Sequence, residues 1–307
     1  MKKIHLFLFL LISLISCKNE YSKNNSETKL YLNGDIITMR GNSPEYKEAI
    51  IVKDKAIQFV GSKEEAMKFV GNNFKVIDLK GNTLLPGFID GHAHFASFSA
   101  QAIGAKILPP PDAGAKDIPS LIKILKKWNT PDNRALTGWI FGMGFDDSVL
   151  EEKRFPTKHD LDQVSTEYPI MIVHISGHFA VVNSKALELL EITSTTKNPE
   201  GGIIRRENGT EPNGVLEELA AIPYMLKVLN PTSNEAAEHF FEAGQEMALS
   251  YGYTTAQEGR AMENHELLVA ASQSGKLKLD VVSYVDYLFV DKFMKSKWNS
   301  SNYHNHY

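Results

Sequence analysis

The sequence has little cysteine, no long apolar run and no concentration of positive charge, and each of these absences excludes a class of protein. Cys17 is the single cysteine in 307 residues, so an internal disulfide is excluded. No run reaches the 18 or more apolar residues of a spanning helix, so the mature chain is not expected to cross a bilayer. A net charge of −4 without a basic stripe gives no sign of a nucleic-acid partner.

What the sequence contains is typical of a globular protein. Hydrophobic residues make up 43% of the chain and charged residues 23%, both ordinary proportions for a folded domain. A length of 307 residues allows one large domain or two modest ones.

The single cysteine ends a stretch that resembles the signal peptide of a bacterial lipoprotein. Residues 1–3 are basic, residues 4–15 are mostly apolar, and Leu-Ile-Ser-Cys then resembles a lipobox. We therefore expect cleavage after residue 16 and lipidation of Cys17. This anchor would hold the protein to a membrane of the bacterial cell envelope, on the periplasmic or extracellular side. A plain secretory signal or an uncleaved anchor is the alternative. Residues 18–29 are polar and are expected to form a flexible tether.

Residues 30–80 are rich in short apolar runs and are expected to form a small β-rich unit. Asn33-Gly34 lies between two such runs and predicts a tight hairpin. The segment 53–55 (Lys-Asp-Lys) lies between two longer runs and predicts a second hairpin.

The chemistry of the chain is centred on residues 84–95, which read LLPGFIDGHAHF. Side chains at i and i+2 of a strand point to the same face, so His92 and His94 can reach one metal ion. Gly91 allows the backbone to bend beside them. Taken alone, such a pair of histidines is more often a surface or hydrogen-bonded pair than a metal site.

Beyond this stretch, predicted strands and helices alternate. Residues 118–128 and 234–251 carry apolar residues at helical spacing. Residues 169–175 form a continuous apolar run, which is typical of a parallel strand buried on both faces. We therefore expect an α/β fold with four or five βα units after residue 80, whereas a complete (β/α)8 barrel has eight.

Five phrases of the sequence together resemble the YtcJ-like branch of the amidohydrolase superfamily, which includes N-substituted formamide deformylase. The phrases are LLPGFIDGHAHF, WIFGMGFDDS, GHFAVVNSKAL, GGIIRRENGTEPNGVLEE and GYTTAQEG. The resemblance covers nearly all of residues 30–290. It implies a partial (β/α)8 TIM-type barrel over residues 81–307, with residues 30–80 as half of a small β-sandwich. It also implies a metal-dependent hydrolase that cleaves carbon–nitrogen bonds other than peptide bonds in a small-molecule substrate.

The resemblance also assigns roles to individual residues. His92 and His94 become ligands of a divalent metal, for which zinc is expected. An acidic ligand is implied as well, and Glu218 is favoured over its neighbour Glu217, with ordinary helix-start charges as the alternative for both. His178 and Glu258 are expected to contact substrate, with purely structural roles as the alternative.

Three other ionisable residues near predicted strand ends are given structural roles. Asp146 and Asp147 are interpreted as an exposed acidic loop, although they could line the mouth of a pocket. His174 lies inside an apolar run and is interpreted as a hydrogen-bonded histidine of the core.

Relatives in the family also use two further histidines and a catalytic aspartate from later strands, and no predicted strand end supplies them here. His239 and His265 lie within predicted helices, while His304 and His306 lie in a polar tail. On this ground we expect the chain to be truncated at its C-terminus and inactive as an enzyme. The alternatives are a non-catalytic lipoprotein remnant and a binding module built on half a barrel.

Overall fold

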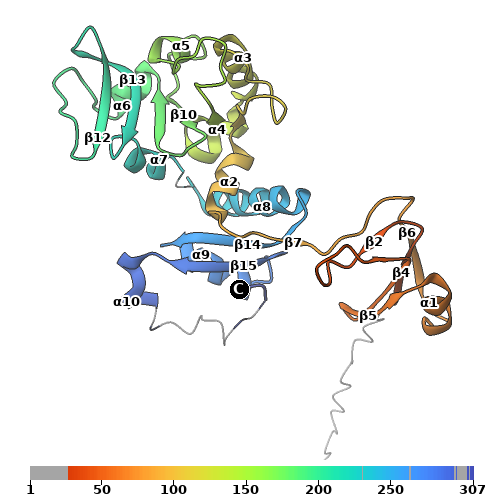
Figure 1. Ribbon diagram of the computed structural model, residues 1–307. Coiled ribbons are helices and arrows are strands. Elements are labelled where there is room, and N and C mark those ends of the chain that lie inside the picture. Colours follow the sequence, from red (N-terminus) through yellow and green to blue (C-terminus); the bar gives the residue numbers. More distant parts are fainter. Residues whose placement is uncertain (1–26, 230, 263, 294, 296–302, 304) are drawn as a thin grey trace, which may run out of the picture. The chain divides into compact units, whose positions relative to one another are not determined.

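The computed structural model describes residues 27–229, 231–262, 264–293, 295, 303 and 305–307 (Figure 1). The chain divides into two compact units, Met1–Pro86 and Gly87–Tyr307. Cys17, the predicted signal peptide (1–17) and most of the predicted tether (18–29) lie outside the described residues, so lipidation stays a prediction. Within the described ranges, no helix is both long and apolar enough to cross a membrane.

The first unit contains a four-stranded sheet in the order β5-β4-β1-β6, in which β1 runs antiparallel to β4 and parallel to β6. Its elements are β1 (Lys29–Leu32), β2 (Ile36–Ile37), β3 (Tyr46–Lys47), β4 (Ala49–Lys53), β5 (Ala56–Gly61), α1 (Lys63–Phe69) and β6 (Lys75–Asp78). Leu30, Ile51 and Ala66 belong to one buried apolar cluster, so α1 packs on this sheet. The predicted sandwich stays a prediction, because the only other sheet in the described part of this unit is the β2–β3 ribbon.

The two predicted hairpins have different outcomes. Residues 53–55 connect β4 to β5, which are antiparallel neighbours, and both Asp54 and Lys55 have positive φ, as a tight hairpin turn requires. The turn at Asn33-Gly34 instead leads from β1 into β2, which belongs to a different sheet, so that prediction is wrong. Turn chemistry fixes where the chain reverses, but pairing with β4 and β6 decides which sheet each strand joins.

The second unit contains two sheets. Its larger sheet has the order β12-β13-β11-β10-β9-β8, and its smaller sheet has the order β15-β14-β7 and is entirely parallel. The strands of the larger sheet are β8 (Ala105–Lys106), β9 (Ile140–Phe145), β10 (Ile170–His174), β11 (Phe179–Val182), β12 (Gly202–Glu207) and β13 (Glu211–Glu218). The strands of the smaller sheet are β7 (Phe88–Ile89), β14 (Tyr253–Ala261) and β15 (Asp280–Val285).

Several helices of this unit begin directly after a capping side chain. The helix bounds are α2 (Phe95–Ile103), α3 (Ile118–Trp128), α4 (Pro131–Thr137), α5 (Lys158–Asp162), α6 (Ser184–Leu189), α7 (Ile222–Val228), α8 (Asn234–Ser250), α9 (Asn264–Gln273) and α10 (Val290–Phe293), with the 3-10 turn η1 (Tyr287–Phe289) before α10. Asp117 and Ser233 cap α3 and α8 by accepting backbone N–H groups of the first turn, whereas α2 and α7 have no capping side chain. Phe95 of α2 meets Phe241 of α8 edge to face at 5.7 Å, so these two helices pack together.

The larger sheet is buried on both faces. Met171 and Val173 of β10 belong to one apolar cluster, while Ile170 and Ile172 belong to the cluster on the opposite face. This alternation confirms the prediction that residues 169–175 form a strand buried on both sides.

The prediction of four or five successive βα barrel units is not supported by the described strands. Only β7, β14 and β15 form a parallel sheet of their own, and no closed barrel is present in the described ranges. Strand β10 is parallel to β9 but antiparallel to β11, because the short segment 175–178 cannot hold the crossover that a parallel connection needs. An apolar run reveals burial on two faces, but it does not reveal which sheet the strand joins.

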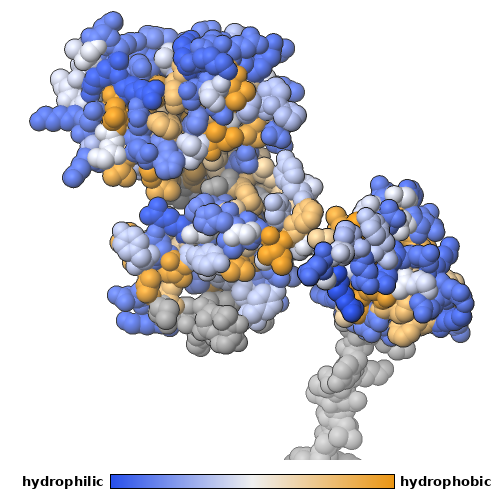
Figure 2. Space-filling model, viewed as in Figure 1, coloured by the Kyte–Doolittle hydropathy of each residue, from blue (hydrophilic) through white to orange (hydrophobic). Residues whose placement is uncertain are grey.

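The smaller sheet leaves apolar side chains exposed. Phe88 and Ile89 of β7 and Val282 and Tyr284 of β15 all have large exposed fractions. Figure 2 shows hydrophobic patches among hydrophilic residues at the level of β14 and β15. Parallel sheets are ordinarily covered on both faces, so these exposed residues at both edges of the smaller sheet depart from that arrangement.

A charged pair at the start of α5 gives a prediction about acid stability. Burial alone would raise the pKa of the Asp160 carboxyl, but hydrogen bonds from Arg154 and Thr157 outweigh burial and bring the pKa below its usual value. Ionised Asp160 therefore stabilises the fold above its unfolded pKa of about 3.9, and this contribution is lost as the pH falls through the folded pKa.

We expect Asp160→Asn to lower the free energy of unfolding by about 1–2 kcal/mol at pH 7, since hydrogen bonds to charged groups contribute about this much when one partner is half exposed. The difference from wild type should shrink below about pH 4. Urea unfolding from pH 3 to 8 measures it. Glu64→Gln, which breaks only the exposed pair with Lys68, is the control and should change little. A difference that does not depend on pH would contradict the prediction.

Candidate functional site

The two histidines of the central motif lie directly after β7 rather than on it. Strand β7 ends at Ile89, and a backbone hydrogen bond of 2.9 Å from the Asp90 amide to the Thr255 carbonyl continues its alignment with β14. The buried Asp90 carboxylate then accepts the His92 amide at 3.0 Å and the Gln257 amide at 3.3 Å. Asp90 thus stabilises the turn that carries the histidines. Because both histidines follow the end of β7, the prediction that they lie on one strand is wrong.

His94 connects this turn to the neighbouring strand and to a helix. It is the N-cap residue of α2, and its backbone forms an isolated bridge with Glu258 of β14. The Gly259 amide donates to the Ala93 carbonyl at 2.8 Å, and a Cβ at Gly259 would lie only 2.7 Å from that oxygen. Position 259 must therefore be glycine for the two segments to approach this closely.

Glu258 places a buried carboxylate beside His94. Its side chain is 3% exposed, and its Oε1 lies 3.8 Å from His94 Nδ1. The Ala96 amide, in the first turn of α2, donates to Oε2 at 3.0 Å, and the Arg260 amide donates to Oε1 at 3.2 Å. The helix N-terminus and two N–H groups therefore stabilise a negative charge at this position.

The chemistry of these side chains suits a divalent metal. Imidazole and carboxylate groups are ligands of zinc and of its first-row neighbours. Bonds of about 2.0–2.2 Å to one ion place neighbouring ligand atoms about 3.0–3.4 Å apart, so the 3.8 Å between His94 and Glu258 needs a shift of about 0.4 Å. The His92 and His94 rings are exposed, with centroids 5.9 Å apart. The residue types thus suit a metal, although in the described structure the ligand atoms of His92, His94 and Glu258 do not all lie within 4.8 Å of one another.

The other residues predicted for the site lie on the larger sheet. Glu218 ends β13 with a positive φ, and its Oε2 lies 2.9 Å from Nδ1 of His178, with both side chains about half exposed. Glu217 pairs with Arg205 instead. The described structure does not assemble Glu218 with His92 and His94 into a three-ligand cluster, so its metal role stays a prediction. The substrate role of His178 likewise stays a prediction.

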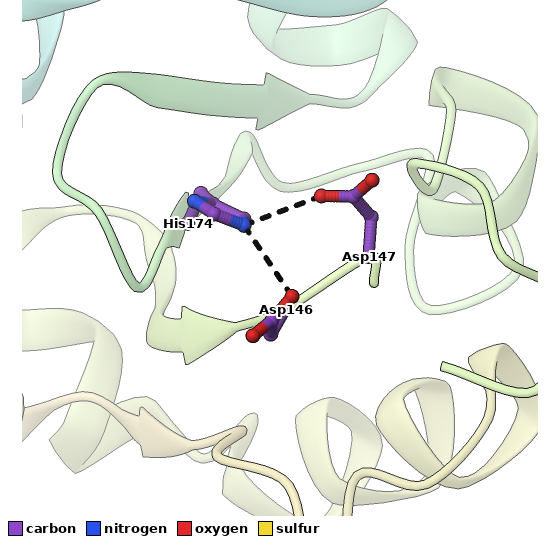
Figure 3. Close-up of side chains that lie close together, drawn as sticks. All are labelled: Asp146, Asp147 and His174. Carbon is purple, nitrogen blue, oxygen red and sulfur yellow. Dashed lines mark ion pairs between the residues drawn. The ribbon is translucent and has the colours of Figure 1, made fainter. Parts of the chain in front are cut away.

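The structure brings together three residues that sequence reasoning had separated. Asp146, Asp147 and His174 each offer a ligand atom within 4.8 Å of the other two, which is true of no other such group in the described part of the chain (Figure 3). The aspartates directly follow β9, and His174 ends β10, which is parallel to β9. Both strand ends were visible in the sequence, but only the parallel pairing places them side by side.

Comparison with known proteins identifies the family. The model of the amidohydrolase family matches residues 75–305. The chain is 32% identical over 176 residues to an N-substituted formamide deformylase of Arthrobacter pascens, covering 57% of this chain and 31% of that protein. It is 29% identical over 210 residues to the YtcJ protein of Bacillus subtilis (strain 168), covering 67% of this chain and 38% of that protein. The chain thus spans about a third of the length of these curated relatives.

A solved structure agrees with these matches. The crystal structure of an uncharacterized metal-dependent hydrolase from Pyrococcus horikoshii OT3 superposes with a TM-score of 0.58 and 25% sequence identity. The superposition covers 87% of this chain and 50% of that one. The chain belongs to the amidohydrolase family, in its YtcJ-like branch.

Proposed function

We propose that the protein is a metal-dependent hydrolase of amide-type carbon–nitrogen bonds in a small molecule, with zinc as its metal. The observation that carries this proposal is the buried carboxylate of Glu258 beside His94, with His92 two residues earlier on the same turn. These residues follow the carboxyl end of β7 and approach the carboxyl end of β14, the side at which parallel α/β folds bind ligands.

Each residue has a distinct part in this proposal. His92 and His94 would hold the metal, and Glu258 would be the third protein ligand or would orient the His94 ring. When bound, the metal lowers the pKa of a water molecule to about 7 and polarises the carbonyl that is to be cleaved. Asp90 holds the backbone of the turn through the amides of His92 and Gln257, which keeps the site from rearranging.

Glu258 is a donor-type side chain beside the motif, while the expectation that the chain is truncated and inactive stays an untested prediction. Two histidines alone are fewer than the three protein ligands of an ordinary catalytic zinc site. Because Glu258 lies within 3.8 Å of His94, a third ligand-type side chain is already present. We therefore propose that the chain retains zinc and hydrolyses its substrate, with N-substituted formamides as the first class to try. The name of the relative from Arthrobacter pascens suggests that class.

The test uses the full chain, stripped of metal by a chelator, supplied with zinc and then freed of excess ion. The His92→Asn/His94→Asn variant should retain one zinc equivalent fewer than wild type by elemental analysis, because both imidazole ligands are gone. Its hydrolysis of N-substituted formamides and N-acyl amines should fall to the buffer rate, whereas wild type should exceed that rate only when zinc is present.

A matched control separates this effect from the loss of any histidine. His159 lies exposed on α5, 2.9 Å from Glu207 of β12, so His159→Asn should retain the zinc and turnover of wild type. Equal zinc content in wild type and the double variant would overturn the metal site. Zinc retention by wild type without turnover on either substrate class would overturn the hydrolase proposal and favour a binding module.

A further inference from the structure

The imidazole of His174 has a buried nitrogen for which the described structure provides no hydrogen-bond partner. This atom is Nε2, and it points toward the carboxylates of Asp146 and Asp147 (Figure 3). A buried polar atom without a partner costs free energy and requires an explanation, and an absent ion is one. We propose that Asp146, Asp147 and His174 form a second divalent-cation site, on the larger sheet and separate from His92 and His94.

An irregularity in the pairing of β9 with β10 brings these three residues together. Val173 pairs with Met143 but His174 pairs with Phe145, so Gly144 is an extra residue in β9, with a φ of +106°. Such a bulge redirects the side chains that follow it and is frequent next to functional sites. The Ile175 amide then donates to the Phe145 carbonyl at 2.9 Å, which holds the two strand ends in register.

The distances between the ligand atoms match those around a bound ion. His174 Nε2 lies 3.3 Å from Asp147 Oδ1 and 3.9 Å from Asp146 Oδ1. Bonds of about 2.0–2.2 Å to one ion place neighbouring ligand atoms about 3.0–3.4 Å apart for angles between 90° and 109°. The Asp147 distance is within this range, and the Asp146 distance needs a shift of about half an ångström.

The ring of His174 is already oriented. Its Nδ1 accepts the Ser176 amide at 3.1 Å and lies 2.8 Å from Ser176 Oγ, and these contacts hold the ring in place. Phe155 stacks on the ring with centroids 5.7 Å apart, while Phe145 and Phe179 meet it edge to face at 5.2 and 5.6 Å. Little side-chain entropy would therefore be lost when an ion binds.

The charge of the cluster also favours a cation. The Ser148 hydroxyl donates a hydrogen bond to Asp146 at 2.6 Å, and this contact lowers the pKa of the Asp146 carboxyl. The side chains of Asp146 and Asp147 are 23% and 30% exposed, which leaves the ion a path from solvent. One imidazole with two carboxylates suits zinc or manganese better than calcium, which prefers oxygen ligands throughout. A direct contact between His174 Nε2 and Asp147 Oδ1, 3.3 Å apart and without an ion, is the competing explanation.

The experiment measures zinc binding to the full chain in the His92→Asn/His94→Asn background, so that the two proposed sites are counted separately. This background should bind one zinc equivalent. Adding Asp147→Asn should weaken that binding at least tenfold, and adding His174→Gln should abolish it. Adding His159→Asn, which removes an exposed ion-paired histidine of α5, should change nothing.

The outcomes also separate this proposal from that of the hydrolase. A background variant that binds no zinc, or an Asp147→Asn variant that binds it as before, overturns the second site and leaves the first untouched. Because Asp147 is partly exposed, its replacement by asparagine should leave cooperative urea unfolding intact, so lost binding is not lost folding. Binding that is unchanged in both Asp147→Asn and His174→Gln would assign the cluster to an ion pair alone.

Discussion

The Phe141→Ala variant is expected to lose about 3–5 kcal/mol of its free energy of unfolding. Phe141 is the second residue of β9 and is fully buried. It belongs to the apolar cluster that also contains Met171 of β10 and Ala100 of α2. Removing the ring loses its transfer free energy and leaves a cavity that the paired strands on either side cannot close.

Urea unfolding of wild type and variant, followed by far-ultraviolet circular dichroism, measures this loss. Leu226→Ala is the matched control, because Leu226 lies on α7 with 55% of its surface exposed, and it should change the free energy of unfolding by less than about 0.5 kcal/mol. A loss below about 1 kcal/mol in Phe141→Ala would show that the larger sheet is not the stable core of this unit.

The elements that sequence reasoning located correctly are those with a strong local pattern. Residues 118–128 have apolar side chains at helical spacing, and α3 occupies that range with Ile118, Leu121, Ile122 and Leu125 all buried. Helix α8 likewise follows the predicted stripe and is capped by Ser233. Period and capping are properties of a few consecutive residues, so one sequence is enough to reveal them.

The elements that were missed depend on distant partners. Strand β11 is only four residues long, and its neighbours in the sheet are β10 and β13, the second of which lies more than 30 residues away. The predicted barrel strands therefore included β9 and β10, which belong to the mixed sheet. A short apolar run has no period long enough to show whether its partner is parallel or antiparallel.

The site residues were likewise found where their pattern is local and missed where their contacts are distant in the sequence. His92 and His94 were found because their motif is continuous, whereas the contact between Glu258 and the Ala96 amide spans 162 residues. Glu258 was chosen as a substrate contact from its place at a strand end, and no local pattern linked it to His94. Asp147 and His174 were each given a structural role for the same reason, since only the pairing of β9 with β10 joins them.

Glu258 provides the prediction with the largest expected effect at the hydrolase site. In Glu258→Ala, the amides of Ala96 and Arg260 lose the acceptors of two part-buried hydrogen bonds, each at a cost of about 1–3 kcal/mol, and a cavity remains. We expect this variant to lose about 3–5 kcal/mol of its free energy of unfolding. Glu258→Gln keeps the volume and one acceptor oxygen, so it should lose no more than about 2 kcal/mol.

The Glu258→Gln variant then separates a role of Glu258 in metal binding from its role in stabilising the fold. If Glu258 serves the proposed metal, Glu258→Gln should bind zinc at the His92–His94 site at least tenfold more weakly, because an amide is a poorer ligand than a carboxylate. The Asp146–Asp147–His174 cluster should keep its own zinc, which provides an internal control in the same titration. Unchanged zinc affinity at both positions in Glu258→Gln would show that the carboxylate only caps α2 and joins it to β14. The metal at the first site would then depend on the two histidines without it.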